Sequence, residues 1–212
     1  MAKTESTLKN MLLTLLVITL ISGASLGGMY KLTKAPIEAS KQAKQQNAIS
    51  QVTPEFDNDP AAEAIEATTE DGSVIKLFPA KKSGELVGMA VESVTNKGFG
   101  GEVRIMIGFR PDGSIINYQV LEHKETPGLG TKMDEWFRTD KGSQSILDKN
   151  PGSNNLTVAK DGGEVDAITA ATISSRAFLD AVDVAYKAFQ ANLPANDVMT
   201  NDSTTIMEGG MQ

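Results

Sequence analysis

The chain has 212 residues, of which 40% are apolar, and a formal net charge of −7. This length accommodates one sizeable domain with appendages, and the acidic balance without a basic stripe argues against binding to nucleic acid. The chain has no cysteine and one histidine, which excludes disulfides, cysteine-ligated iron–sulfur clusters, thioether-linked haem and the usual histidine-rich zinc site. Any redox role therefore requires an organic cofactor.

An uncharged, mostly apolar segment occupies residues 10–30. As a helix rising about 1.5 Å per residue, this segment would span roughly 31 Å, close to the thickness of the hydrocarbon core of a bilayer. We therefore predict a short cytoplasmic N-terminus at residues 1–9 and a transmembrane helix at residues 10–30.

A cleaved signal peptide is the alternative for the same segment. Lys3 and Lys9 would form its charged start, residues 11–21 its apolar run, and the small residues 22–25 its exit. Further lysines lie between residues 31 and 44, so the distribution of positive charge leaves the orientation in the membrane open.

A stalk is predicted at residues 31–60. Residues 35–52 are rich in alanine, lysine and glutamine and favour a helix, with Pro36 in its first turn. Pro54 ends this helix, and residues 61–68 are predicted to add a short helical turn.

The middle of the chain has the pattern of an antiparallel sheet. Segments that mix β-branched and other apolar residues alternate with turn signals, of which Pro111-Asp112-Gly113 favours a hairpin most strongly. The predicted strands are residues 73–78, 86–94, 102–109 and 115–122. A loop from His123 to Gly130 follows, then a short amphipathic piece at 133–137, a further helical turn at 143–147, and short strands at 156–158 and 165–168.

The last predicted element is a helix at residues 174–192. Its apolar residues recur at helical spacing and form one buried stripe. Ser174 or Ser175 is the predicted N-cap, Pro194 the stop, and residues 194–212 a disordered tail. The stripe consists of Ala177, Phe178, Ala181, Val182, Ala185, Ala188 and Phe189.

Hydroxyl side chains cluster where the last short strand gives way to this helix, over residues 166–175. The free N–H groups and the positive dipole end of a helix N-terminus favour an anion. Small Ala170 and Ala171 would let a bulky ligand approach, and Arg176 could pair with a phosphate. Helix capping, worth about 1 kcal/mol, is the alternative role for these hydroxyls.

The same segment resembles the attachment site of the FMN-binding domains in bacterial Rnf and Na⁺-translocating NADH:quinone reductase complexes. The family pattern is an Asp followed by a Ser/Thr-Gly-Ala-Thr core, whose last threonine is joined to the FMN phosphate. Asp166 matches the acid, Thr169 the first hydroxyl, Ala171 the small residue and Thr172 the modified threonine. Ala170 stands where the family usually has glycine.

Two other segments extend the resemblance over roughly residues 10–192. Residues 98–102 look like the family's glycine–aromatic–glycine segment, and residues 125–130 like its Glu-Thr-Pro-Gly-Leu-Gly loop. The chain is most similar to the G subunit of the Rnf complex, with the C subunit of the quinone reductase as the alternative.

The resemblance implies an α+β fold in which residues 61–193 form an FMN-binding domain. It implies a phosphoester between FMN and Thr172, made by a separate flavin transferase. The chain would then be a single-pass protein of the inner (cytoplasmic) membrane, with its C-terminal domain on the periplasmic side. It would relay electrons within a complex that links ferredoxin and NAD⁺, beside other membrane subunits that include a second flavin-bearing one.

The remaining predicted site residues have supporting roles. Asp166 and Thr169 would shape the motif that the transferase recognises, and Ser174 and Ser175 would satisfy phosphate oxygens or free helix N–H groups. The loop would contact the flavin ring or ribityl chain, unless it is only a rigid turn. The loop residues concerned are Glu125, Thr126, Gly128 and Leu129.

Alternative roles concern single residues and the chain as a whole. Trp136 is expected in the core rather than against the ring, and His123 is expected to be a loop residue. A flavin-free, membrane-anchored assembly module, in which Thr172 only caps the helix, is the alternative from a different functional class. A hydrolase that uses Ser174 or Thr172 with His123 is a further alternative, which the absence of a base–orienter pattern disfavours.

Overall fold

The computed structural model describes residues 7–69, 72 and 74–193. The predicted stop at Pro194 and the predicted disordered tail lie outside the described residues. The chain divides into two compact units, Met1–Gln46 and Asn47–Gln212.

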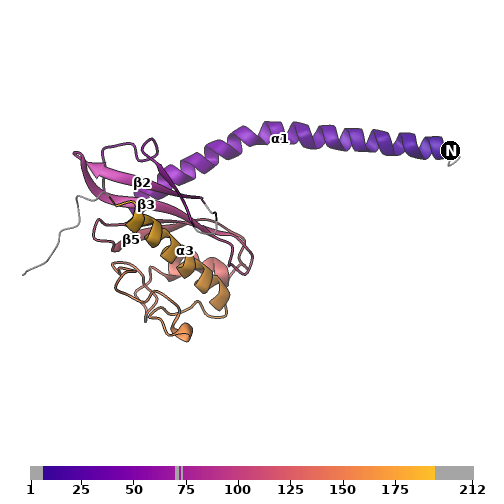
Figure 1. Ribbon diagram of the computed structural model, residues 1–212. Coiled ribbons are helices and arrows are strands. Elements are labelled where there is room, and N and C mark those ends of the chain that lie inside the picture. Colours follow the sequence, from indigo (N-terminus) through magenta and orange to yellow (C-terminus); the bar gives the residue numbers. More distant parts are fainter. Residues whose placement is uncertain (1–6, 70–71, 73, 194–212) are drawn as a thin grey trace, which may run out of the picture. The chain divides into compact units, whose positions relative to one another are not determined.

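The predicted transmembrane and stalk helices are one helix, α1 (Leu8–Val52), drawn in indigo and violet in Figure 1. Pro36 therefore lies inside a helix, and the prediction that it occupies a first turn is wrong. By length and composition α1 is able to cross a membrane. The hydroxyls of Thr14, Thr19 and Thr33 donate to the carbonyls four residues earlier, which satisfies them within the helix.

A five-stranded antiparallel sheet forms the centre of the second unit, with the strands in the order β1-β2-β3-β4-β5. The four predicted strands are confirmed as β2 to β5. Residues 65–68, predicted to be helical, instead form edge strand β1, because Ile65 and Ala67 pair with Leu77 and Ile75 of β2. The strands are β1 (Ile65–Thr68), β2 (Val74–Lys82), β3 (Glu85–Thr95), β4 (Val103–Phe109) and β5 (Ile115–His123).

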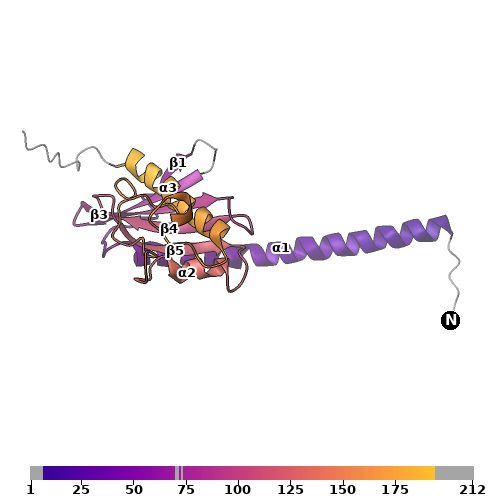
Figure 2. The same ribbon diagram turned by 90° about the horizontal axis from the view of Figure 1, so that it is seen from below.

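Helix α3 (Thr172–Ala191) lies along one face of the sheet, as Figures 1 and 2 show. Its predicted apolar stripe is buried there, except that Ala188 is half-buried. Phe178 is central, because its ring stacks on Phe137 at a centroid distance of 4.4 Å and meets Tyr118 edge-on at 4.8 Å. On the opposite face, residues 48–52 at the end of α1 pack against β2, β3 and β4. The sheet is thus covered on both sides, and the α+β fold class is confirmed.

The segment between β5 and α3 is mostly loop. It contains η1 (Gly130–Lys132), α2 (Met133–Trp136) and η2 (Ala159–Asp161). Residues 143–147 are not helical, so that prediction is wrong. The two predicted short strands reduce to one parallel bridge between Val158 and Val165.

Candidate functional site

Helix α3 begins at Thr172, two residues earlier than predicted, and its N-cap residue Ala171 makes no side-chain capping hydrogen bond. Ser174 and Ser175 lie inside the first turn and are buried, so the prediction that one of them is the N-cap is wrong. Ser175 Oγ accepts from the N–H of Ile168 at 2.9 Å and donates to the carbonyl of Ala171 at 3.0 Å. Without a side-chain cap, the start of α3 retains its capacity to attract an anion.

A sharp turn brings the chain to Thr172. Ala170 has a φ of 62°, in the left-handed region, and the N–H of Ala171 donates to the carbonyl of Ile168 at 2.9 Å. This is the conformation that glycine adopts without a steric penalty. Ala170 therefore adopts the backbone conformation that the family's glycine would favour, at a cost of roughly 1–2 kcal/mol.

Glu125 connects the segments that were singled out in the sequence. Its side chain is buried, and the carboxylate accepts a hydrogen bond from Ser174 Oγ at 2.6 Å and one from the N–H of Gly100 at 3.2 Å. A β-carbon at Gly130 would lie 2.7 Å from a Glu125 oxygen, and one at Gly98 would also collide with the carboxylate. The glycines of both loops thus make room for this one carboxylate.

A pocket of about 340 Å³ opens beside Thr172. It lies between the loop that contains Phe99, the loop after β5, and the first turn of α3. Five of the predicted site residues line it: Thr126, Leu129, Ala171, Thr172 and Ser174. Its size is within the range of small-molecule sites, which commonly occupy 300–1,000 Å³.

The other predicted site residues lie outside this lining. Glu125 reaches the pocket through its hydrogen bond to Ser174. Asp166 accepts from the N–H of Ser143 at 2.8 Å through its side chain, and its backbone carbonyl accepts from Trp136 Nε1. Thr169 is exposed, next to Ala170 in the sequence. In the loop after β5, the N–H of Gly128 donates to the hydroxyl of Thr131. Asp166 and Gly128 thus stabilise the two loops that border the pocket.

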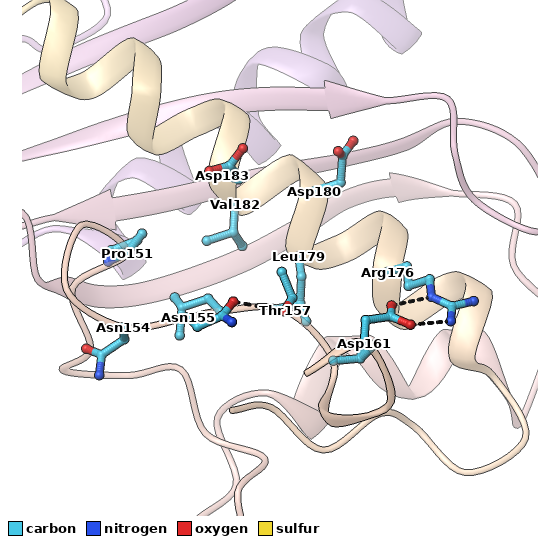
Figure 3. A pocket seen from close by; sticks show the side chains of 12 residues that line it. Pro151, Asn154, Asn155, Thr157, Asp161, Arg176, Leu179, Asp180, Val182 and Asp183 are labelled. Carbon is cyan, nitrogen blue, oxygen red and sulfur yellow. Dashed lines mark hydrogen bonds and ion pairs between the residues drawn. The ribbon is translucent and has the colours of Figure 1, made fainter. Parts of the chain in front are cut away.

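Arg176 is not placed to serve the pocket beside Thr172. Its guanidinium makes two hydrogen bonds of 2.7 Å to Asp161, and this contact lowers the pKa of the Asp161 carboxyl below its usual value. Figure 3 shows the pair at one end of a second hollow beside α3, which has a volume of about 370 Å³. The prediction that Arg176 serves a phosphate at Thr172 therefore has no support in the geometry.

Each carboxylate in this second hollow has a partner. Asp180 accepts from Thr95 and Lys97, and Asp183 pairs with Lys187. The hollow therefore offers a ligand few charges that are not already used. Over the described part of the chain, no cluster of three or more His, Cys, Asp or Glu side chains is suited to a metal ion.

Sequence reasoning did not single out Phe99 and Ile173 as site residues. Both line the pocket and both are exposed, Phe99 to 68% and Ile173 to 48%. The available signal was the position of Phe99 between glycines, where a large apolar side chain has little local packing.

Trp136 and His123 do not line the pocket. The Nδ1 of His123 accepts a hydrogen bond from the N–H of Glu125 at 3.2 Å.

Comparison with known proteins gives matches over most of the chain. Residues 98–187 match the model of the FMN-binding domain family. The G subunit of the ion-translocating oxidoreductase complex of Vibrio cholerae serotype O1 (strain M66-2) is 30% identical, over 80% of this chain and 84% of the relative. The G subunit of Pasteurella multocida (strain Pm70) is 35% identical over 79% and 86%, and that of Cereibacter sphaeroides is 32% identical over 78% and 77%.

Proposed function

Because the chain belongs to the family of the G subunits of ion-translocating oxidoreductase complexes, we propose that it is an electron-carrying FMN subunit of an Rnf-type ferredoxin:NAD⁺ oxidoreductase. The FMN-binding domain at residues 98–187 supports the cofactor. The observation that carries the proposal is the pocket beside Thr172, which the three motif segments form together. The names of the relatives favour this assignment over a C-type quinone reductase subunit.

We further propose that FMN is attached through its phosphate to the hydroxyl of Thr172. A flavin transferase would supply the FMN half of flavin adenine dinucleotide: the Thr172 oxygen bonds to the FMN phosphorus, AMP leaves, and the hydroxyl proton is released. Thr172 lies in the lining of the pocket at the first residue of α3, where the N–H groups and the helix dipole favour a phosphate. The product is a phosphodiester that retains the cofactor without altering its ring.

The chain's own residues would bind and orient this group. Thr172 is an attachment point, and it takes no part in turnover. Asp166 and Thr169 present the attachment segment to the transferase, and Ala171 leaves space beside it. Ser174 and Ser175 hold the first turn of α3. Thr126 and Leu129 would form the opposite wall, in a loop that Glu125 and Gly128 stabilise. Bound FMN supplies the one- and two-electron chemistry.

The membrane arrangement is part of the same proposal. Residues 10–30 of α1 would anchor the chain in the inner membrane, residues 31–60 would link the anchor to the domain at 61–193, and this domain would lie on the periplasmic side. The apolar surface of α1 supports the anchor. Its partners would be other membrane subunits of the complex, among them a second flavin-bearing one to which electrons pass.

Co-production with a flavin transferase, followed by a denaturing gel, tests the attachment. We expect a fluorescent band that survives denaturation and disappears in Thr172→Ala, while Thr139→Ala, at an exposed threonine after α2, keeps it. Fluorescence of Trp136 would verify that both variants fold. A wild-type band without flavin fluorescence would contradict the proposal and favour the assembly module.

A further inference from the structure

A buried carboxylate lies directly behind the wall of the pocket at Thr172. Glu125 is only 5% exposed and does not itself line the pocket, but its side chain contacts two residues that do. One carboxylate oxygen accepts from Ser174 Oγ at 2.6 Å, and a β-carbon added to Gly130 would lie 2.7 Å from the same oxygen. The carboxylate is therefore adjacent to the pocket lining on two sides.

Only neutral groups bind this carboxylate. They are the Ser174 hydroxyl and the N–H of Gly100, and both are donors, as the acceptor oxygens of an ionised carboxylate require. Among the residues that the structure describes, none of the ion pairs includes Glu125. A buried charge without a cation acts strongly on its surroundings, because little water or salt screens it.

Holding the loops does not require a charge at this position. A neutral glutamine would accept from Gly100 and donate to Ser174, and burying a carboxylate without a cation costs stability. The charge therefore indicates a role toward whatever occupies the pocket. Reduction of a flavin adds two electrons and, at neutral pH, one proton, so the flavin becomes more negative. A fixed negative charge behind the pocket wall opposes this change.

We propose that the negative charge of Glu125 lowers the midpoint potential of the FMN and so makes the reduced cofactor a stronger electron donor to the next carrier. This inference rests on the proposed attachment of FMN to Thr172. It gives Glu125 an electrostatic role beyond its contacts with the three motif segments, and it requires no bond between Glu125 and the cofactor.

The full chain, matured with a flavin transferase and kept in detergent, allows a direct test. Dithionite supplies the electrons in a redox titration, and the visible absorbance of the flavin reports its reduction. We expect a more positive midpoint potential in Glu125→Gln than in the wild type, and this shift should persist in high salt. Glu85→Gln removes the same charge from an exposed position at the start of β3 and should leave the potential unchanged.

A looser pocket would also shift the potential, because it would admit water to the flavin. Ser174→Ala separates the two effects, since it removes the shorter hydrogen bond to Glu125 but keeps the charge. We expect no rise in potential in Ser174→Ala. In Glu125→Gln, acrylamide, a neutral quencher, should quench the flavin emission to the same extent as in the wild type.

An unchanged potential in Glu125→Gln, or an equal rise in Ser174→Ala, would overturn the electrostatic role and leave the attachment intact. Loss of flavin from Glu125→Gln alone would assign this residue to the attachment step and would also overturn the proposal. A wild-type chain without flavin in a denaturing gel would overturn the attachment, and this inference with it.

Discussion

Replacing Glu125 should show whether one carboxylate holds the three motif segments in place. In Glu125→Ala, the Ser174 hydroxyl and the Gly100 N–H lose a buried acceptor that they now reach at 2.6 and 3.2 Å. A hydrogen bond to a charged group contributes about 1.5–3 kcal/mol, and the longer bond lies at the weak end of that range. We therefore expect the free energy of unfolding to fall by about 3 kcal/mol.

Glu125→Gln separates the hydrogen bonds from the charge. Its amide oxygen can still accept from Gly100, and its NH₂ group can donate to the Ser174 oxygen, so both contacts survive in neutral form. We expect a loss of only about 1 kcal/mol. Urea unfolding, followed by the fluorescence of the single tryptophan, Trp136, measures both changes.

Glu85→Gln is the matched control, because Glu85 is exposed at the start of β3 and its replacement should be nearly neutral. A loss below about 1 kcal/mol in Glu125→Ala would refute the reasoning, because the loops would then be held by other contacts. An equal loss in the Ala and Gln variants would show that the charge, and not the pair of hydrogen bonds, is required.

Three further substitutions test particular features of the fold. Ala170→Gly should raise the free energy of unfolding by about 0.5–1 kcal/mol, because relief of the left-handed backbone is partly offset by the larger conformational entropy of glycine in the unfolded chain. An unchanged urea midpoint would contradict this. Gly130→Ala should lower the free energy of unfolding by about 1–3 kcal/mol, because its β-carbon would lie 2.7 Å from Glu125. A neutral result would show that the loop can move to accommodate the β-carbon. Burial raises the pKa of Tyr118 to about 12, above the unfolded value of about 10. Stability is therefore fully present below pH 10 and is lost as the pH rises toward 12, and Tyr118→Phe should show a shallower loss in alkaline unfolding curves.

The sequence predicted the elements whose pattern is set by local periodicity. Helix α3 buries one stripe at helical spacing, and β3 and β4 are mainly apolar runs buried on both faces and bounded by turn signals, so these patterns are visible without the fold. The segments at residues 65–68 and 143–147 are too short to show such a pattern, and their conformation is determined by tertiary contacts. In the second case the N–H of Ser143 donates to Asp166 and that of Ile146 to Phe137, which holds the segment in a non-helical conformation.

The residues that line the candidate pocket were predictable where a linear motif contains them. Thr172, Leu129 and Thr126 were expected on that basis, and the structure places them around one pocket. Ser174 was expected as a cap because hydroxyls before a helix usually are, but its partner Glu125 lies 49 residues away in sequence. Arg176 was expected at the phosphate, although Asp161 of η2, 15 residues earlier in the sequence, binds it. Such pairings arise only from the folded arrangement of the loops.

The attachment of FMN to Thr172 is tested most directly by mass spectrometry of protein matured with its flavin transferase. Trypsin releases residues 161–176 as one peptide, since cleavage follows Lys160 and Arg176. We predict a peptide heavier than the bare sequence by one FMN less one water, with fragment ions that assign the addition to Thr172. A bare peptide, or an addition on Thr169, Ser174 or Ser175, would contradict the account.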